Sequence, residues 1–124
     1  METVATGVSR ADREALVNEL QQAITALNKV WPLLDRADPK QAAQRQYLMS
    51  ERRQLNSQLD RTLDDVYERP GSKIELALLE LQQASLRAAD ARLAIQQQQR
   101  LYESVADVIE QAGKAVAAVA SVFG

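Results

Sequence analysis

Side chains suited to acid–base or metal chemistry are scarce in this chain of 124 residues. It contains neither cysteine nor histidine, which excludes thiolate nucleophiles, thiolate zinc sites and imidazole acid–base groups. One group of carboxylates has the i,i+4 spacing that places pairs on one helix face: Asp60, Asp64, Asp65 and Glu68. Such a pair can hold a hard cation, but neither a glutamate–histidine motif nor a glycine-containing calcium loop accompanies it. Because arginines flank the group, we expect a solvated face, with no metal and no cofactor.

Arginine side chains in the same region are the other candidates for a reactive site, because they can bind an anionic substrate. They are Arg45, Arg52, Arg53 and Arg61. These arginines alternate with acidic residues, which is typical of an exposed surface rather than a converging pocket. Arg52 falls on the apolar seam of its segment, where we expect the stem to pack and the guanidinium to reach solvent. No glycine-rich phosphate loop or nucleophile elbow occurs, so we expect no catalytic residue and no enzyme.

The overall composition argues against nucleic-acid-binding, membrane-spanning and secreted proteins. Fifteen Lys and Arg residues against 17 Asp and Glu give a formal net charge of −2, so the surface is not built to neutralise nucleic-acid phosphates. No apolar run approaches the roughly 18 to 20 residues that a membrane-spanning helix needs. The first residues lack the basic-then-apolar order of a secretory signal, and we expect a cytoplasmic location. Strong helix formers dominate the chain, which predicts an all-α fold.

Helix starts and stops are marked at several points. Pro32 should kink or end a first helix, and Asp38 followed by Pro39 should start a second. Ser72 and Glu75 fit a capping box that starts a third. The predicted fold is a three-helix antiparallel bundle. We expect a disordered N-terminus over 1–8 and a bundle over 9–100, with helices at about 9–31, 39–69 and 73–100.

A strict seven-residue repeat runs through the last fifty residues. Its members are Ile74, Leu81, Ala88, Ile95, Tyr102, Ile109, Val116 and Phe123. A sustained heptad is typical of a helix that winds around its neighbours, so we predict one over-long third helix, with a candidate break near Gly113. At 1.5 Å per residue it would be about 75 Å long, against about 35 to 45 Å for the other two. The glutamine-rich segment 96–100 is expected to remain a solvated part of this helix.

The residues beside the heptad row change sides along the predicted helix. The first half is joined by Leu78 and, further round the helix, by Leu79, Leu86 and Leu93. The second half is joined by the opposite flank, so residues 101–124 should project beyond the bundle with an uncovered apolar face. Leaving that face in water would cost roughly 1.5 to 3 kcal/mol for each large side chain. We therefore predict a docking segment whose partner-binding residues are Leu101, Tyr102, Val105, Val108, Ile109, Ala112, Val116, Val119, Val122 and Phe123.

These patterns favour a non-enzymatic helical protein that acts through protein–protein association, as an assembly factor, adaptor or chaperone-like component. The expected partner is a second copy of the chain or another helical protein, and nucleic acid is not expected. A competing hypothesis is a peripheral membrane protein that uses its Ala/Val-rich tail, although that tail has no charged face opposite its apolar one. A third hypothesis is a small-ligand or metal-binding helical bundle.

Overall fold

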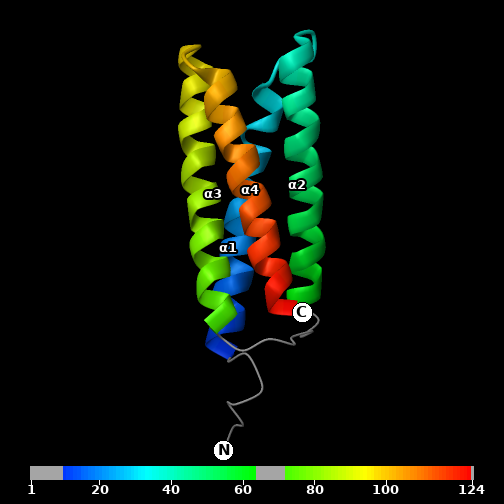
Figure 1. Ribbon diagram of the computed structural model, residues 1–124, viewed down its shortest axis with the longest axis vertical. Coiled ribbons are helices and arrows are strands. Elements are labelled where there is room, and N and C mark those ends of the chain that lie inside the picture. Colours follow the sequence, from blue (N-terminus) through cyan, green and yellow to red (C-terminus); the bar gives the residue numbers. More distant parts are fainter. Residues whose placement is uncertain (1–9, 64–71, 124) are drawn as a thin grey trace, which may run out of the picture.

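The computed structural model describes residues 10–63 and 72–123, which form four α-helices. Helix α1 spans Arg10–Asn28, α2 spans Pro39–Leu63, α3 spans Ser72–Gln97 and α4 spans Leu101–Phe123, with a short 3-10 turn, η2, at Trp31–Leu33. Successive helices run in opposite directions along one long axis (Figure 1). The predicted all-α class is therefore confirmed, whereas the prediction of three helices with an over-long third is wrong.

The four helices form a ring in the order α1, α2, α4, α3, with α3 packed most extensively on α4. One result is that α2 and α4 lie side by side and run in the same direction (Figure 1). Each helix turns one face inward, as expected for amphipathic helices in a bundle. The largest fully buried side chains are Leu16, Leu20, Leu27, Val30, Leu48, Leu55, Ile74, Leu81, Val105, Val108, Val119 and Phe123.

The predicted start of α2 at Asp38 and Pro39 is confirmed. The Oδ1 atom of Asp38 accepts hydrogen bonds from the backbone N–H groups of Lys40, at 2.9 Å, and Gln41, at 3.4 Å. Asp38 therefore caps the free amides at the start of α2. Pro32 lies in η2, beyond the end of α1. The predicted disordered N-terminus over 1–8 and the predicted end of the second helix at about residue 69 lie outside the described residues.

The chain reverses at residues 98–100, in the segment that was expected to stay helical. Gln98 has a φ of 54°, its N–H donates to the carbonyl of Ile95 at 3.2 Å, and the N–H of Gln99 donates to the carbonyl of Ala94 at 3.0 Å. This pair of bonds, with a left-handed residue at the first position after the helix, is a Schellman motif. It ends α3 without a glycine, so the sequence carries no conventional stop signal.

Helix α4 starts immediately after this reversal. Arg100 also has a positive φ, of 52°, and its carbonyl accepts the N–H of Ser104 at 3.0 Å. Its Nε atom pairs with a carboxylate oxygen of Glu103 at 2.7 Å. The helix then continues without interruption through Gly113 to Phe123. The candidate break near Gly113 is therefore wrong, and residues 101–123 are a separate fourth helix rather than an extension of the third.

Glutamine side chains of α2 bind backbone carbonyls of α4 at a constant offset. The Nε2 atom of Gln44 donates to the carbonyl of Tyr102 at 2.9 Å, and Nε2 of Gln58 donates to the carbonyl of Val116 at 2.8 Å. Both pairs are 58 residues apart in the sequence. A constant offset over two heptads is expected from parallel helices, and it fixes the register of α2 against α4.

Glu51 lies midway between these two glutamines and at the same heptad position of α2. The offset aligns it with Ile109, and an ideal Cβ placed on Gly113, one turn further along α4, would be 3.6 Å from Oε1 of Glu51. An ionised carboxylate can accept hydrogen bonds but cannot donate one to a carbonyl as the glutamines do. Burial against α4 raises the pKa of Glu51 above its usual value of 4.5.

Candidate functional site

The ten residues predicted to bind a partner lie on α4, and the bundle encloses most of them. Six are buried: Val105, Val108, Ala112, Val119, Val122 and Phe123. The other four, Leu101, Tyr102, Ile109 and Val116, are half-buried. Helices α2 and α3 cover this face because the chain turns back at residues 98–100. The overhang that motivated docking through α4 does not exist.

Tyr102 has a structural role that its sequence position did not suggest. Its hydroxyl donates a short hydrogen bond to Oδ2 of Asp38, and Nζ of Lys40 lies 4.6 Å from the centroid of its ring. The hydrogen bond lowers the pKa of Asp38, with a further contribution from Gln41, and raises the pKa of Tyr102. The start of α4 is thereby tied to the N-terminal cap of α2.

The arginines considered as an anion site do not converge. The guanidinium carbon of Arg45 lies 4.8 Å from the centroid of the Trp31 ring, and that of Arg61 lies 4.3 Å from the Phe123 ring. Sixteen residues separate these two arginines on α2, about 24 Å along the helix. Arg52 is half-buried, and its Nε atom has no hydrogen-bond partner among the described residues.

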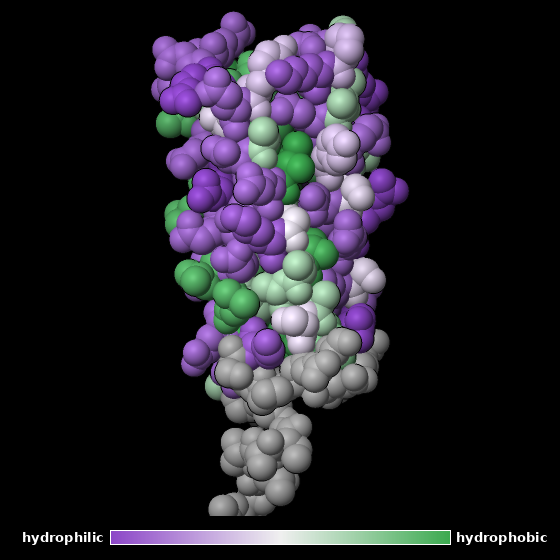
Figure 2. All heavy atoms as spheres, viewed as in Figure 1, coloured by the Kyte–Doolittle hydropathy of each residue, from purple (hydrophilic) through white to green (hydrophobic). Residues whose placement is uncertain are grey.

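An apolar surface that the sequence did not identify as such lies on the outer side of α3. We call it the leucine row: Leu76, Leu79, Leu86 and Leu93, which are 49%, 50%, 60% and 52% exposed. Their spacings of three, seven and seven residues place them along one strip of the helix. Figure 2 shows hydrophobic side chains recurring along the edge that α3 forms. Single exposed leucines are common on protein surfaces, whereas a regularly spaced strip marks a candidate interaction site.

The sequence pattern placed three of these leucines further round the helix than Leu78, on the flank of the core row, but did not separate them from it as an exposed face. Leu86 follows Leu81, a fully buried member of that row, by five residues. At 3.6 residues per turn, five residues correspond to a rotation of about 140°. Leu79 and Leu93 have the same relation to Ile74 and Ala88. Their seven-residue spacing therefore describes a second face, and the rotation between the two rows was the signal that could have revealed it.

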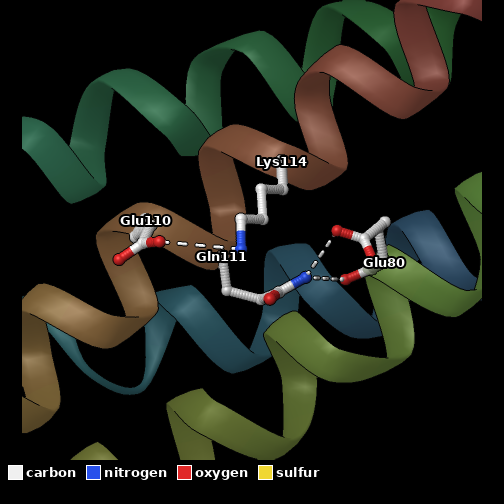
Figure 3. Close-up of polar contacts among 4 residues, drawn as sticks. All are labelled: Glu80, Glu110, Gln111 and Lys114. Carbon is white, nitrogen blue, oxygen red and sulfur yellow. Dashed lines mark hydrogen bonds and ion pairs between the residues drawn. The ribbon is translucent and has the colours of Figure 1, made fainter.

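The side of the leucine row next to α4 is held in place by a buried glutamine. The Nε2 atom of Gln111 donates to the backbone carbonyl of Glu80 at 3.2 Å and to its Oε2 atom at 3.1 Å (Figure 3). Gln111 is only 5% exposed, so this amide joins the two helices from within. Beside it, Lys114 pairs with Glu110 at 3.6 Å along α4. The Glu80 carboxylate is thus positioned at the edge of the leucine row.

Two grooves flank α3. The groove between α3 and α4 has a volume of about 470 Å³ and small side chains along its floor, and its lining is Lys73, Leu76, Glu80, Lys114, Ala117, Ala118 and Ser121. It is continuous with the leucine row through Leu76. The groove between α1 and α3 has a volume of about 410 Å³. Its lining is mainly amide and small side chains, with Lys29 and Arg92 as its charged members.

The ligand-binding and membrane hypotheses were also compared with the structure. Among residues 10–63 and 72–123, no three acidic side chains are grouped closely enough to hold a metal ion. Three members of the acidic group, Asp64, Asp65 and Glu68, lie outside the described residues. Within the same two ranges, no helix has the length and apolar character needed to cross a membrane. The Ala/Val-rich tail is part of α4, with Ala115, Ala118 and Val119 buried in the bundle.

Comparisons of the chain with protein-family models, with curated proteins and with solved structures gave no match.

Proposed function

We propose that this chain is a non-enzymatic helical protein that acts through protein–protein association, and that it docks its partner on the leucine row of α3. The observation that carries this proposal is the exposure of all four leucines to about half or more of their area. The partner is a helical protein, either a second copy or a different chain. The role is that of an assembly factor, adaptor or chaperone-like component.

The energy available at the leucine row supports an interaction of useful strength. Complete burial of one leucine contributes about 1.5 to 3 kcal/mol, so burying the exposed half contributes about 0.8 to 1.5 kcal/mol. The four leucines together would contribute about 3 to 6 kcal/mol from this side of an interface. A partner that offers a similar apolar strip would contribute a similar amount. Part of this gain is offset by the translational and rotational freedom lost on association.

The geometry also favours a helix as the partner. The leucine row follows one helix and has the heptad-like spacing through which helices pack side by side. The neighbouring groove between α3 and α4 has alanine and serine among its lining residues, and small residues of this kind leave room for a side chain from an approaching helix. Extended peptides usually add to an exposed sheet edge, and the described residues contain helices only.

The test is site-specific photo-crosslinking in the cells that make the chain. A benzophenone amino acid at Gln83, which lies between Leu79 and Leu86 in the sequence of α3, should give a defined adduct. The same probe at Gln54, exposed on α2, should not. The adduct at position 83 should disappear in a chain that also carries Leu86→Gln. Equal labelling at both positions, or labelling that is insensitive to Leu86→Gln, would refute the proposal.

The fold of the Leu86→Gln variant can be checked independently. Leu86 is 60% exposed and contributes little to the core, so its replacement should change the free energy of unfolding by no more than about 0.5 kcal/mol. A melting curve that matches the unmodified chain would show that loss of the adduct reflects loss of docking. A large drop in melting temperature would show that the leucine row is needed for folding, which contradicts a docking surface.

A further inference from the structure

We propose that the partner that covers the leucine row is a second copy of this chain, with the two α3 helices packed antiparallel. This inference rests on the proposed function and adds the identity of the partner. It is carried by the distribution of charge along the outer side of α3, which is not uniform from one end to the other.

The two halves of α3 carry opposite charge beside the leucine row. The first half has Glu75 and Glu80 against a single cation, Lys73. The second half has Arg87 and Arg92 against a single anion, Asp90, with Arg92 on the side of α3 that lines the groove next to α1. All six side chains are exposed or half-buried. Antiparallel packing of two copies places the acidic half of each helix against the basic half of the other, whereas parallel packing places like charges together.

The spacing of the leucines defines the antiparallel register. When Leu76 lies opposite the partner's Leu93, the leucines at both ends of the leucine row are covered by leucines of the partner. The two-fold axis then passes between Gln83 and Leu86. Glu80 and Arg87 are seven residues apart, so they occupy the same flanking heptad position. In an antiparallel pair this position of one helix faces the same position of the other, so Glu80 of each copy lies opposite Arg87 of its partner. The contact is isologous, as the interface of a two-fold dimer must be, and it forms two equivalent ion pairs.

Parallel packing in the matching register is unfavourable at two places. It sets Asp90 directly opposite the partner's Asp90, next to the leucines. It also brings Glu80 close to the partner's Glu75, again twice because of the symmetry. Like charges in such positions oppose association. The antiparallel register replaces both contacts, setting Asp90 opposite a leucine and Glu80 opposite an arginine.

The size of the surface predicts a weak dimer. Helix α3 has 26 residues and is therefore about 39 Å long, and a strip about 10 Å wide gives a footprint of about 400 Å² on each copy. This is about half of the roughly 800 Å² that each partner buries in an interface of standard size. We therefore expect a dimer that dissociates on dilution, with a dissociation constant in the range of about 10 to 100 µM.

Sedimentation velocity of the full chain from about 5 to 500 µM tests the dimer. The weight-average mass should rise from 13.8 kDa towards twice that value. Leu86→Gln should abolish the rise, whereas Leu63→Gln should leave it unchanged, since Leu63 is 50% exposed but lies on α2. A chain that stays monomeric at the highest concentration would overturn the inference, as would an equal loss of association in the two variants.

Charge reversal tests the antiparallel arrangement. In a dimer of the Glu80→Arg variant, both Glu80–Arg87 pairs become arginine–arginine contacts, and in a dimer of the Arg87→Glu variant both become glutamate–glutamate contacts. Each variant alone should therefore associate about tenfold more weakly at low salt. An equimolar mixture should recover the original affinity, because one chain then carries both arginines and the other both glutamates. Failure of the mixture to associate more strongly than either variant would refute the antiparallel pairing. Since Glu80 also binds Gln111, the folding of its variant is checked by circular dichroism.

The outcomes separate this inference from the proposed function. A monomeric chain that still gives a Leu86-dependent crosslink to a different protein would overturn the second-copy inference and leave docking on the leucine row supported. Loss of both self-association and the crosslink would refute both.

Discussion

Replacement of Glu51 with glutamine should stabilise the bundle at neutral pH. Glu51 lies between Gln44 and Gln58 at the same heptad position, and each of these glutamines donates a hydrogen bond to a carbonyl of α4. The parallel register of α2 and α4 places position 51 against the equivalent turn of α4. A glutamine there can donate to the carbonyl of Ile109, whereas an ionised carboxylate can only accept. The substitution also removes a charge that is partly withdrawn from water.

The expected gain follows from the added hydrogen bond. A net contribution of about 0.5 to 1.5 kcal/mol is typical of one neutral hydrogen bond in a folded protein. For a chain of 124 residues, a gain of about 1 kcal/mol raises the melting temperature by about 3 to 6 °C. Glu51→Leu serves as a control, because leucine removes the charge but cannot donate. It should gain less than Glu51→Gln if the hydrogen bond is the main cause.

The pH dependence gives an independent check. Burial raises the folded-state pKa of Glu51 above 4.5, so its protonated form stabilises the fold below pH 4.5, and this contribution is lost as the pH rises through the folded-state pKa. Chemical denaturation should therefore show nearly equal stabilities for the variant and the unmodified chain near pH 4, and a gap that opens towards pH 7. A gap that is absent at pH 7, or that does not change between these values, would refute this account of position 51.

The reverse substitution is the matched test of the same reasoning. Gln58→Glu replaces a donor to the Val116 carbonyl with a carboxylate that faces it, so it should destabilise the bundle by about 1 to 3 kcal/mol at pH 7. Protonation restores a donor, and the loss should shrink on acidification. Equal stability of Gln58→Glu and the unmodified chain at pH 7 would show that these side-chain bonds contribute little to the packing of α2 on α4.

Three further substitutions test other parts of the fold by thermal and chemical denaturation. Gln98→Gly should raise the free energy of unfolding by about 1 kcal/mol, because glycine adopts the left-handed conformation without steric cost; a loss would contradict the assigned turn. Gly113→Ala should also stabilise by about 1 kcal/mol, since the new Cβ would make only an ordinary contact with Glu51, and destabilisation would show that α4 needs closer packing there. Tyr102→Phe should destabilise the bundle at neutral pH, because it removes the hydrogen bond to Asp38. The loss of stability should shrink at low pH, as Asp38 is protonated through its lowered pKa, and again above pH 10, as Tyr102 of the unmodified chain is deprotonated through its raised pKa. An effect independent of pH would argue against the Tyr102–Asp38 hydrogen bond.

Helix boundaries that are marked by a capping side chain or a proline were predictable from the sequence. Asp38 carries a side-chain acceptor, Pro39 lacks the amide that a helix start leaves free, and the structure starts α2 at this point. Pro32 likewise lies beyond the end of α1. These signals depend on one or two residues and on backbone geometry alone, so they do not require knowledge of the partner helices.

The reversal between α3 and α4 was not predictable by the same means. Gln98 and Arg100 adopt left-handed conformations that side chains other than glycine rarely take, and glutamine is a good helix former. What stabilises the turn is distant: the new helix can bury its valines and Phe123 against α2 and α3. The seven-residue repeat did not distinguish one long helix from two. It only requires that every residue of the repeat faces a core, which is true of one long helix and of two helices packed in the same bundle. The change of flanks near Ile95 was the better indicator of two helices.

The polar contacts within the bundle could not be predicted from hydropathy. Gln44, Gln58 and Gln111 are buried, yet each lies at a position where a sequence pattern would place a surface residue. Their burial depends on a neighbouring helix that presents a carbonyl or a carboxylate at the right distance. Helix α2 buries only two leucines, Leu48 and Leu55, because part of its packing on α4 is made by amide side chains rather than by aliphatic ones.

Helix α3 differs from a helix that serves only one core. Its inner row, which includes Ile74 and Leu81, is fully buried, and in a ring of four helices each member needs only one such face. The leucine row lies about 140° round the same helix and contributes little to the enclosed core. A second apolar face is typical of a helix packed on two sides, and the bundle covers only one of them. The side packed by α1 and α4 accounts for the fold, and the proposed association would account for the exposed side that bears Leu79, Leu86 and Leu93.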